Sequence, residues 1–192
     1  MTKWIISETL RDPQDPDWEK LVASFFPEDV NPRRKEGFLL SRSSLRDCLS
    51  TVKINCPILS LHLINHSSLK EYPQFTISLS HTNNCGAALI AERNFFRSTG
   101  IDVEHEERNV KDSVLERIKH SNDLNLRNID LWCLKEAVFK TLMNSGFFKN
   151  PIDFSSICIQ KNEWTHSPSD LSGKWELDKL QSYVVARSFL EN

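Results

Sequence analysis

Residues 99–107 read TGIDVEHEE, a short hydrophobic strand that carries two acids, Asp102 and Glu104. Side chains alternate between the two faces of a strand, so these carboxylates project together while Ile101 and Val103 point the other way. Two carboxylates held side by side repel each other unless a cation or a proton lies between them. The pair therefore indicates either a solvent-exposed strand edge or a site for a cation, and two acids alone favour neither.

The hydrophobic pattern of the rest of the chain predicts α+β structure with antiparallel sheets. Apolar residues recur with helical spacing in four segments, at 17–26, 31–52, 112–120 and 130–146. Strand patterns occur at 74–82, 86–91, 99–104, 153–160, 174–180 and 182–190. In the first of these strands, Phe75, Ile77 and Leu79 alternate with hydroxyl side chains. We therefore expect that strand to be buried on one face only and to form a hairpin with 86–91.

The composition is that of a globular protein and limits its partners. The 192 residues are 39% apolar and 26% charged, and the net charge of −2 gives no overall positive field for nucleic acid. No apolar run is long enough to cross a membrane, and the first residues lack the apolar stretch of a secretory signal. The five scattered cysteines form no CxxC pair, which predicts reduced thiols and a cytoplasmic location.

The segment 130–146 adds a third acid to the pair on the strand. Trp132, Glu136 and Lys140 follow one another at intervals of four, on a face beside the apolar stripe of this helix. A surface ion pair between Glu136 and Lys140 would explain the last two and would contribute only about 0.3–0.5 kcal/mol. A third carboxylate near Asp102 and Glu104 would instead complete an oxygen site of the kind that Mg²⁺ prefers when it shares phosphate oxygens with a substrate.

Basic side chains that could bind such phosphates occur on the helix at 31–52, which Asn31 is placed to cap. Arg34, Arg42 and Arg46 lie at multiples of four along it, and most arginine rows of this kind are solvated helix faces. His81 directly follows a strand, where a histidine is more often an ordinary loop residue. Taken alone, the arginine row favours a solvated helix face, and His81 favours a loop residue with no part in catalysis.

Four segments together resemble a known family. They are RRKEGFLLSR (33–42), SLSHT (78–82), GIDVE (100–104) and WCLKEAVFK (132–140). The chain resembles the 4′-phosphopantetheinyl transferases of the larger, monomeric type, over residues 30–160. The hallmarks of that family are a Gly-Ile-Asp-x-Glu strand and a later Trp-x-x-Lys-Glu-Ala/Ser-x-x-Lys helix, and both are complete here. Such enzymes move the phosphopantetheine arm of coenzyme A to a serine of an apo acyl or peptidyl carrier protein and release adenosine 3′,5′-bisphosphate.

The resemblance also implies residue roles. The implied ligands of Mg²⁺, or of Mn²⁺, are Asp102, Glu104 and Glu136. The implied contacts to the phosphates of coenzyme A are Ser80, His81, Thr82, Lys135 and Lys140, and the implied contacts to its 3′-phosphate or adenine end are Arg34 and Arg42. The implied catalytic residues are Glu136, Lys140 and His81. Glu136 or a water on the metal would take the serine proton.

The fold that the resemblance implies is α+β, with two similar lobes related by a pseudo-twofold axis. Each lobe would have a small antiparallel sheet packed on a long helix, and coenzyme A would bind between the lobes. The boundary would fall within 92–98, which gives lobes of 1–95 and 96–192. Because the two lobes of one chain already form the active-site interface, we expect a monomer.

One departure from the family concerns residues 63–75, LINHSSLKEYPQF. Many members carry Gly-Lys-Pro before the Ser-His strand, and here that lysine is absent, since Lys70 has the wrong spacing. A non-catalytic module that binds coenzyme A or a carrier protein is therefore an alternative. A Mg²⁺-dependent phosphodiesterase is a second one, although it would not explain SLSHT and WCLKEAVFK together. A purely structural role would leave the convergence of three acids without a reason.

Overall fold

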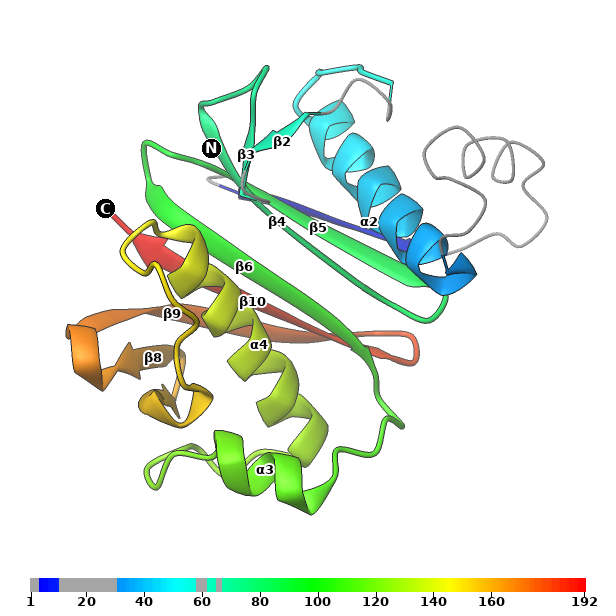
Figure 1. Ribbon diagram of the computed structural model, residues 1–192. Coiled ribbons are helices and arrows are strands. Elements are labelled where there is room, and N and C mark those ends of the chain that lie inside the picture. Colours follow the sequence, from blue (N-terminus) through cyan, green and yellow to red (C-terminus); the bar gives the residue numbers. More distant parts are fainter. Residues whose placement is uncertain (1–3, 11–30, 58–61, 65–66) are drawn as a thin grey trace.

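The computed structural model describes residues 4–10, 31–57, 62–64 and 67–192 and has α+β architecture with antiparallel sheets (Figure 1). One sheet has the order β1-β5-β4, from β1 (Trp4–Leu10), β5 (Cys85–Glu92) and β4 (Phe75–Thr82). A second sheet has the order β6-β10-β9-β8-β7, from β6 (Phe96–His105), β10 (Tyr183–Glu191), β9 (Leu171–Leu180), β8 (Glu163–His166) and β7 (Ile157–Gln160). The short strands β2 (Leu63–Ile64) and β3 (Ser68–Leu69) pair with each other.

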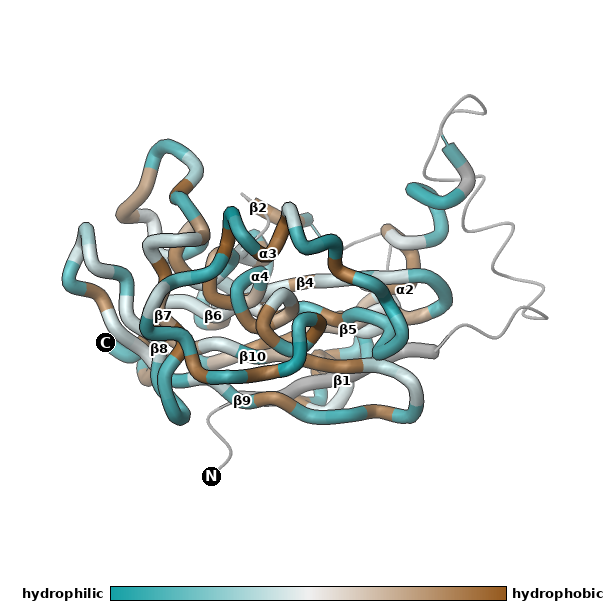
Figure 2. The backbone as a smooth tube through the Cα atoms, turned by 90° about the horizontal axis from the view of Figure 1, so that it is seen from below, coloured by the Kyte–Doolittle hydropathy of each residue, from teal (hydrophilic) through white to brown (hydrophobic). Residues whose placement is uncertain are grey.

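Each large sheet has its own long helix, and the two helices lie on opposite sides of the strands (Figure 1). α2 (Pro32–Thr51) packs on β1, β5 and β4, whereas α4 (Asn128–Asn144) packs on β6 and β10. The short helix α3 (Asp112–Ile118) precedes α4, and two single turns, η2 (Phe154–Ser156) and η3 (Ser167–Ser169), flank β7 and β8. Figure 2 shows β7 and β8 on the opposite side of the molecule from α2. Of the described helices, none has the length and apolar character needed to cross a membrane.

Most of the predicted elements are confirmed, with a few exceptions. α2 begins where expected, and the Asn31 side chain accepts a hydrogen bond from the Arg33 amide. The predicted helices at 112–120 and 130–146 and all the predicted strands are present. The strands β1, β2, β3 and β8 were not predicted, and β2, β3 and β8 are too short to show a regular pattern. The helix predicted at 17–26 lies outside the described residues.

Two glycines allow the helices to approach their sheets closely. A Cβ atom at Gly86 of β5 would lie 2.3 Å from the Leu40 carbonyl carbon of α2. A Cβ atom at Gly100 of β6 would lie 1.9 Å from the Ala137 carbonyl oxygen of α4. No side chain fits at either position, so glycine in each strand permits direct contact between strand and helix backbones.

The first sheet lies between α2 and the edge of the second sheet. Ala88 and Ile90 of β5 pack with α2, whereas Ala87 and Leu89 on the opposite face pack with Val103 and its neighbours on β6 and β10. The first sheet therefore has apolar contacts on both faces, and no layer of water separates it from the second sheet.

The prediction that β4 is buried on one face only is wrong. Ser78 and Ser80 are buried, because this face of β4 lies against β6. The Ser78 Oγ accepts a hydrogen bond from the Ile101 amide at 3.0 Å, and the Ser80 Oγ accepts one from the Val103 amide at 3.4 Å. Serine hydroxyls thus take the place of backbone acceptors where the two sheets meet.

We expect Ser78→Ala to destabilise the protein. The substitution leaves the buried Ile101 amide without its acceptor, which costs about 1–3 kcal/mol of unfolding free energy. Urea unfolding followed by circular dichroism measures the change, and Ser172→Ala on the exposed face of β9 is the matched control. Equal unfolding free energies for the two variants would show that the hydrogen bond from the Ile101 amide to Ser78 contributes nothing to stability.

Candidate active site

Three elements meet at the carboxylate of Asp102. Ser80 of β4 donates a hydrogen bond to Asp102 Oδ1 at 2.7 Å, and Lys140 of α4 forms an ion pair with the same oxygen at 2.7 Å. The Lys140 ammonium also donates to Ser80 Oγ at 3.1 Å and to the Ile101 carbonyl at 2.9 Å. The ion pair of Lys140 is thus made with the strand acid, and not with Glu136 on its own helix as a surface pair would require.

Glu104, the second acid of the strand, is bound by side chains on its other side. Trp132 Nε1 of α4 donates to Glu104 Oε1 at 3.1 Å, and the Arg108 guanidinium forms an ion pair with this oxygen. Thr82 of β4 donates to Glu104 Oε2 at 3.4 Å. Asp102 and Glu104 are 6% and 7% exposed, so both carboxylates are held inside the protein by donors from β4 and α4.

Glu136 is half-buried on α4, one turn before Lys140. Burial raises the pKa of Glu136, and the negative charge of Asp102 raises it further. The cations Lys140 and Arg108 act on the pKa of Glu136 in the opposite direction. The third acid therefore lies within the electrostatic field of the first.

His81 lies at the end of β4, beside the same groups. Burial lowers the pKa of its imidazole, and the Lys140 ammonium lowers it further, against the opposing effect of Asp102 and Glu36. The ring lines a cavity of about 210 Å³ between α2 and the β4–β5 turn, together with Arg33, Glu36, Gly37, Thr82 and Asn83. His81 thus connects the acidic cluster to the start of α2.

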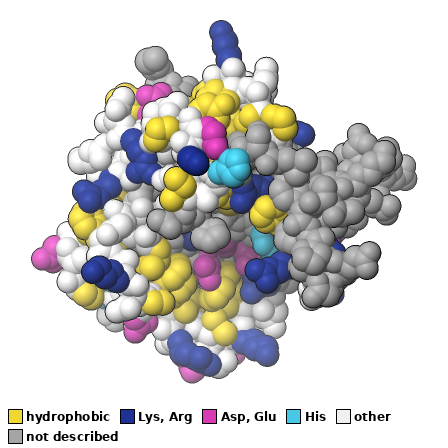
Figure 3. Space-filling model, turned by 45° about the horizontal axis from the view of Figure 1, so that its top comes forward, with side chains coloured by type: hydrophobic (Ala, Val, Ile, Leu, Met, Phe, Trp, Pro, Cys, Tyr) yellow, Lys and Arg dark blue, Asp and Glu magenta, His cyan; other side chains and the backbone are white. Residues whose placement is uncertain are grey.

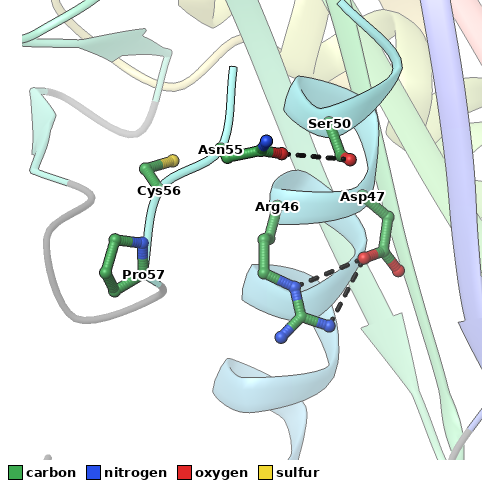
Figure 4. Close-up of a pocket in the computed structure, with 6 residues that line it drawn as sticks. All are labelled: Arg46, Asp47, Ser50, Asn55, Cys56 and Pro57. Carbon is green, nitrogen blue, oxygen red and sulfur yellow. Dashed lines mark hydrogen bonds and ion pairs between the residues drawn. The ribbon is translucent and has the colours of Figure 1, made fainter. Parts of the chain in front are cut away.

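The arginines of α2 do not form a single cluster. Arg42 is half-buried with its guanidinium 4.6 Å from the centroid of the Phe38 ring, and burial lowers its pKa to about 10. Arg34 is exposed near the start of the helix. Arg46 is paired with Asp47 and lines a separate pocket of about 420 Å³ at the other end of α2 (Figure 4).

Lys135 does not join the site. Its side chain is fully buried and forms an ion pair at 2.9 Å with Asp123, whose side chain is also fully buried. The Lys135 ammonium also donates to the carbonyl of Ile157 and, at 3.4 Å, to that of Phe154. Burial lowers the pKa of Lys135, and Asp123 opposes this shift. The expected contact of Lys135 with a phosphate is not supported, because the side chain holds the loop before α4 against β7.

The acids are compensated by cations of the protein itself. Among the described residues, no group of three or more His, Cys, Asp or Glu side chains is arranged to hold a metal ion. One acceptor nevertheless stands out, since Asp102 Oδ2 is buried without a hydrogen-bond partner in the part of the chain that the structure describes. A buried carboxylate oxygen of this kind is a vacant acceptor for a cation.

Two partners of the acidic cluster were not predicted from the sequence. Arg108 follows the turn after β6 and binds back to Glu104, and the strand pattern contains no signal for this contact. Phe154 stacks on Phe139 and on Trp132, with centroids 4.9 and 6.2 Å apart, and supports the indole that binds Glu104. On the face shown in Figure 3, acidic side chains lie near the centre, with hydrophobic side chains below them and basic ones beside them.

Comparisons with known proteins identify no relative. No protein-family model matches the chain, and a search of curated proteins gives no match. The function is therefore argued from the arrangement of Ser80, Asp102, Glu136 and Lys140.

We expect Glu136→Gln to raise the melting temperature at pH 7. The raised pKa means that the folded protein binds the Glu136 proton more tightly than the unfolded chain does, so the ionised carboxylate costs folding free energy at neutral pH. Below the unfolded pKa of about 4.3 both states are protonated and the gain disappears. Thermal melts between pH 3.5 and 8 without divalent cations, with exposed Glu116→Gln as the control, measure this dependence. A lower melting temperature at pH 7 would contradict the expected repulsion.

Proposed function

We propose that this protein is a Mg²⁺-dependent 4′-phosphopantetheinyl transferase that moves the phosphopantetheine arm of coenzyme A to a serine of an apo acyl or peptidyl carrier protein. The observation that carries the proposal is the buried Asp102 Oδ2, which has no hydrogen-bond partner among the described residues and lies near Glu136, an acid of raised pKa. Contacts between SLSHT, GIDVE and WCLKEAVFK through Ser80, Asp102 and Lys140 support it further.

The donor set fits a divalent cation that prefers oxygen. Asp102 through its vacant oxygen and Glu136 are the first candidate ligands, and Glu104 joins them if the half-exposed Arg108 releases it. Held by these carboxylates, Mg²⁺ would neutralise negative charge on the coenzyme A pyrophosphate. The raised pKa of Glu136 agrees with a need for such a cation beside Asp102.

The side chains around the acids supply the other requirements of phosphoryl transfer. Lys140 and His81 would contact the pyrophosphate and stabilise the charge that develops on it. The serine oxygen forms a bond to the phosphorus that carries the pantetheine arm, and the bond from that phosphorus to the oxygen of adenosine 3′,5′-bisphosphate breaks. Glu136, or a water held by the cation, would accept the serine proton.

The basic face of α2 suits the nucleotide end of coenzyme A. Arg42 and Arg34 would bind the 3′-phosphate or the adenine, since a guanidinium can hold a phosphate by two hydrogen bonds. Arg42 is already held over Phe38, which reduces the side-chain entropy lost on binding. Lys135 has no part in this proposal.

We also propose the finer fold description, with two lobes at 1–95 and 96–192 related by a pseudo-twofold axis. Its support is the repeated arrangement of one long helix on one antiparallel sheet, with a glycine at each helix–strand contact, Gly86 against α2 and Gly100 against α4. This boundary also divides the strands of the two large sheets in the chain. The last strand of the first sheet ends at Glu92, and the first strand of the second sheet begins at Phe96. A single chain would then form the complete site as a monomer.

We expect this protein to modify an apo acyl carrier protein when it is incubated with coenzyme A and Mg²⁺. Intact-protein mass spectrometry should detect the gain of one phosphopantetheine group, and EDTA should prevent it. Calorimetry with coenzyme A in parallel identifies the non-catalytic alternative. If coenzyme A binds while a panel of fatty-acid, polyketide and peptide carriers stays unmodified, the protein is a binding module; release of adenosine 3′,5′-bisphosphate without a carrier indicates a phosphodiesterase.

We expect Asp102→Asn to reduce the transfer rate at least about 100-fold, because an amide keeps the shape of the side chain but not the charge that a cation requires. Glu107→Gln, an exposed acid in the same acidic stretch, is the matched control and should transfer at the wild-type rate. Circular dichroism checks that both variants are folded. Near wild-type transfer by Asp102→Asn would show that Asp102 binds no essential cation.

A further inference from the structure

Gly37 lies in the second turn of the 20-residue helix α2, where glycine is unfavourable. Its backbone is helical, and Gly146 is the glycine with positive φ in the described ranges, so backbone conformation does not require glycine at position 37. The missing side chain must therefore be explained by what surrounds the helix at this point.

The reason is the imidazole of His81. A Cβ atom at Gly37 would lie 2.3 Å from His81 Cε1, 2.3 Å from its Nδ1 and 2.7 Å from its Cγ, and these are the three nearest atoms. A real Cβ contact shorter than 3.0 Å does not occur without movement. The His81 ring thus rests directly on the backbone of α2, in a space that only glycine leaves open.

We infer that Gly37 is a positioning residue that sets the orientation of the His81 imidazole toward the acidic cluster. The ring lies against the helix backbone at Gly37 and lines the same cavity as Arg33 and Glu36, although His81 remains partly open to solvent. Lys140 and Asp102 act on it from α4 and β6, and Glu36 acts on it from α2. This role of Gly37 in ligand binding rests on the proposed function, whereas its role in placing the ring does not.

The substitution Gly37→Ala tests the inference because it separates the position of His81 from the stability of the fold. Alanine is the better helix former, and the atoms it meets belong to a side chain that can turn away. The melting temperature should therefore stay at or above the wild-type value while the His81 ring moves. Ser50→Ala, at an exposed position further along α2, is the matched control.

The first readout is the ¹H–¹³C correlation spectrum of the six histidines, recorded without ligand and assigned with His81→Ala. We expect the His81 Cε1–H signal to shift in Gly37→Ala more than any other histidine signal, and to stay unchanged in Ser50→Ala. An unchanged His81 signal would overturn the inference. A lower melting temperature with shifts spread over β4 and β5 would also overturn it, because the helix would then have moved instead of the ring.

The second readout is the affinity for coenzyme A in the presence of Mg²⁺, measured by calorimetry. Gly37→Ala should weaken binding at least about tenfold through the displaced ring. In the His81→Ala background the same substitution should change affinity by less than about twofold, because the clashing ring is absent and the two positions are coupled. A full tenfold loss in that background would overturn the positioning role. If wild-type protein does not bind coenzyme A but the His81 signal shifts as expected, the proposed function fails while the placement of the ring by Gly37 stands.

Discussion

The structure depends on the way in which two sheet edges are joined without a backbone ladder. β4 and β6 belong to different sheets, and the hydroxyls of Ser78 and Ser80 accept the amides of Ile101 and Val103. The two bridges advance in the same direction along both strands, so the strands run parallel. A serine oxygen can accept an amide and donate to a carboxylate at once, which a backbone carbonyl cannot do. The same joint that connects the sheets therefore also holds Asp102.

Charge balance at this joint comes from the protein itself. Lys140 compensates Asp102, and Arg108 compensates Glu104, so two buried acids are tolerated in the absence of any ligand. The charge balance is incomplete at two places. Asp102 Oδ2 has no hydrogen-bond partner among the described residues. Burial and the negative charge of Asp102 raise the pKa of Glu136. Arg108 is about half exposed and can release Glu104 to another cation, whereas the Lys140 side chain is only 26% exposed and is bound to Asp102.

The sequence predicts the helices and strands well because their apolar periods are regular. Strand alternation places Asp102 and Glu104 on one face, and helical spacing places Glu136 and Lys140 on one face, but only the family resemblance implied that this strand and this helix meet. Prediction from the sequence fails where a side chain packs against a segment that is distant in the chain. The hydroxyl face of β4 has the pattern of a solvent-exposed face and is buried by β6. Lys135 is adjacent to Glu136 in sequence, but its side chain is fully buried and bound to Asp123. Long-range pairs of this kind leave no periodic trace in the chain.

The order of the strands has a consequence for the synthesis of the chain on the ribosome. The partners β1, β4 and β5 and the helix α2 are all complete by Glu92, so this part can fold before the rest of the chain has been translated. β6 carries Asp102 and Glu104, but its sheet neighbour is β10, which ends almost 90 residues later at Glu191. Until β10 has been translated, the strand with the two acids has only the serine edge of β4 to pair with. Asp102 and Glu104 are therefore among the last residues of the proposed site to reach their final positions, whereas His81 lies in the part that is complete early.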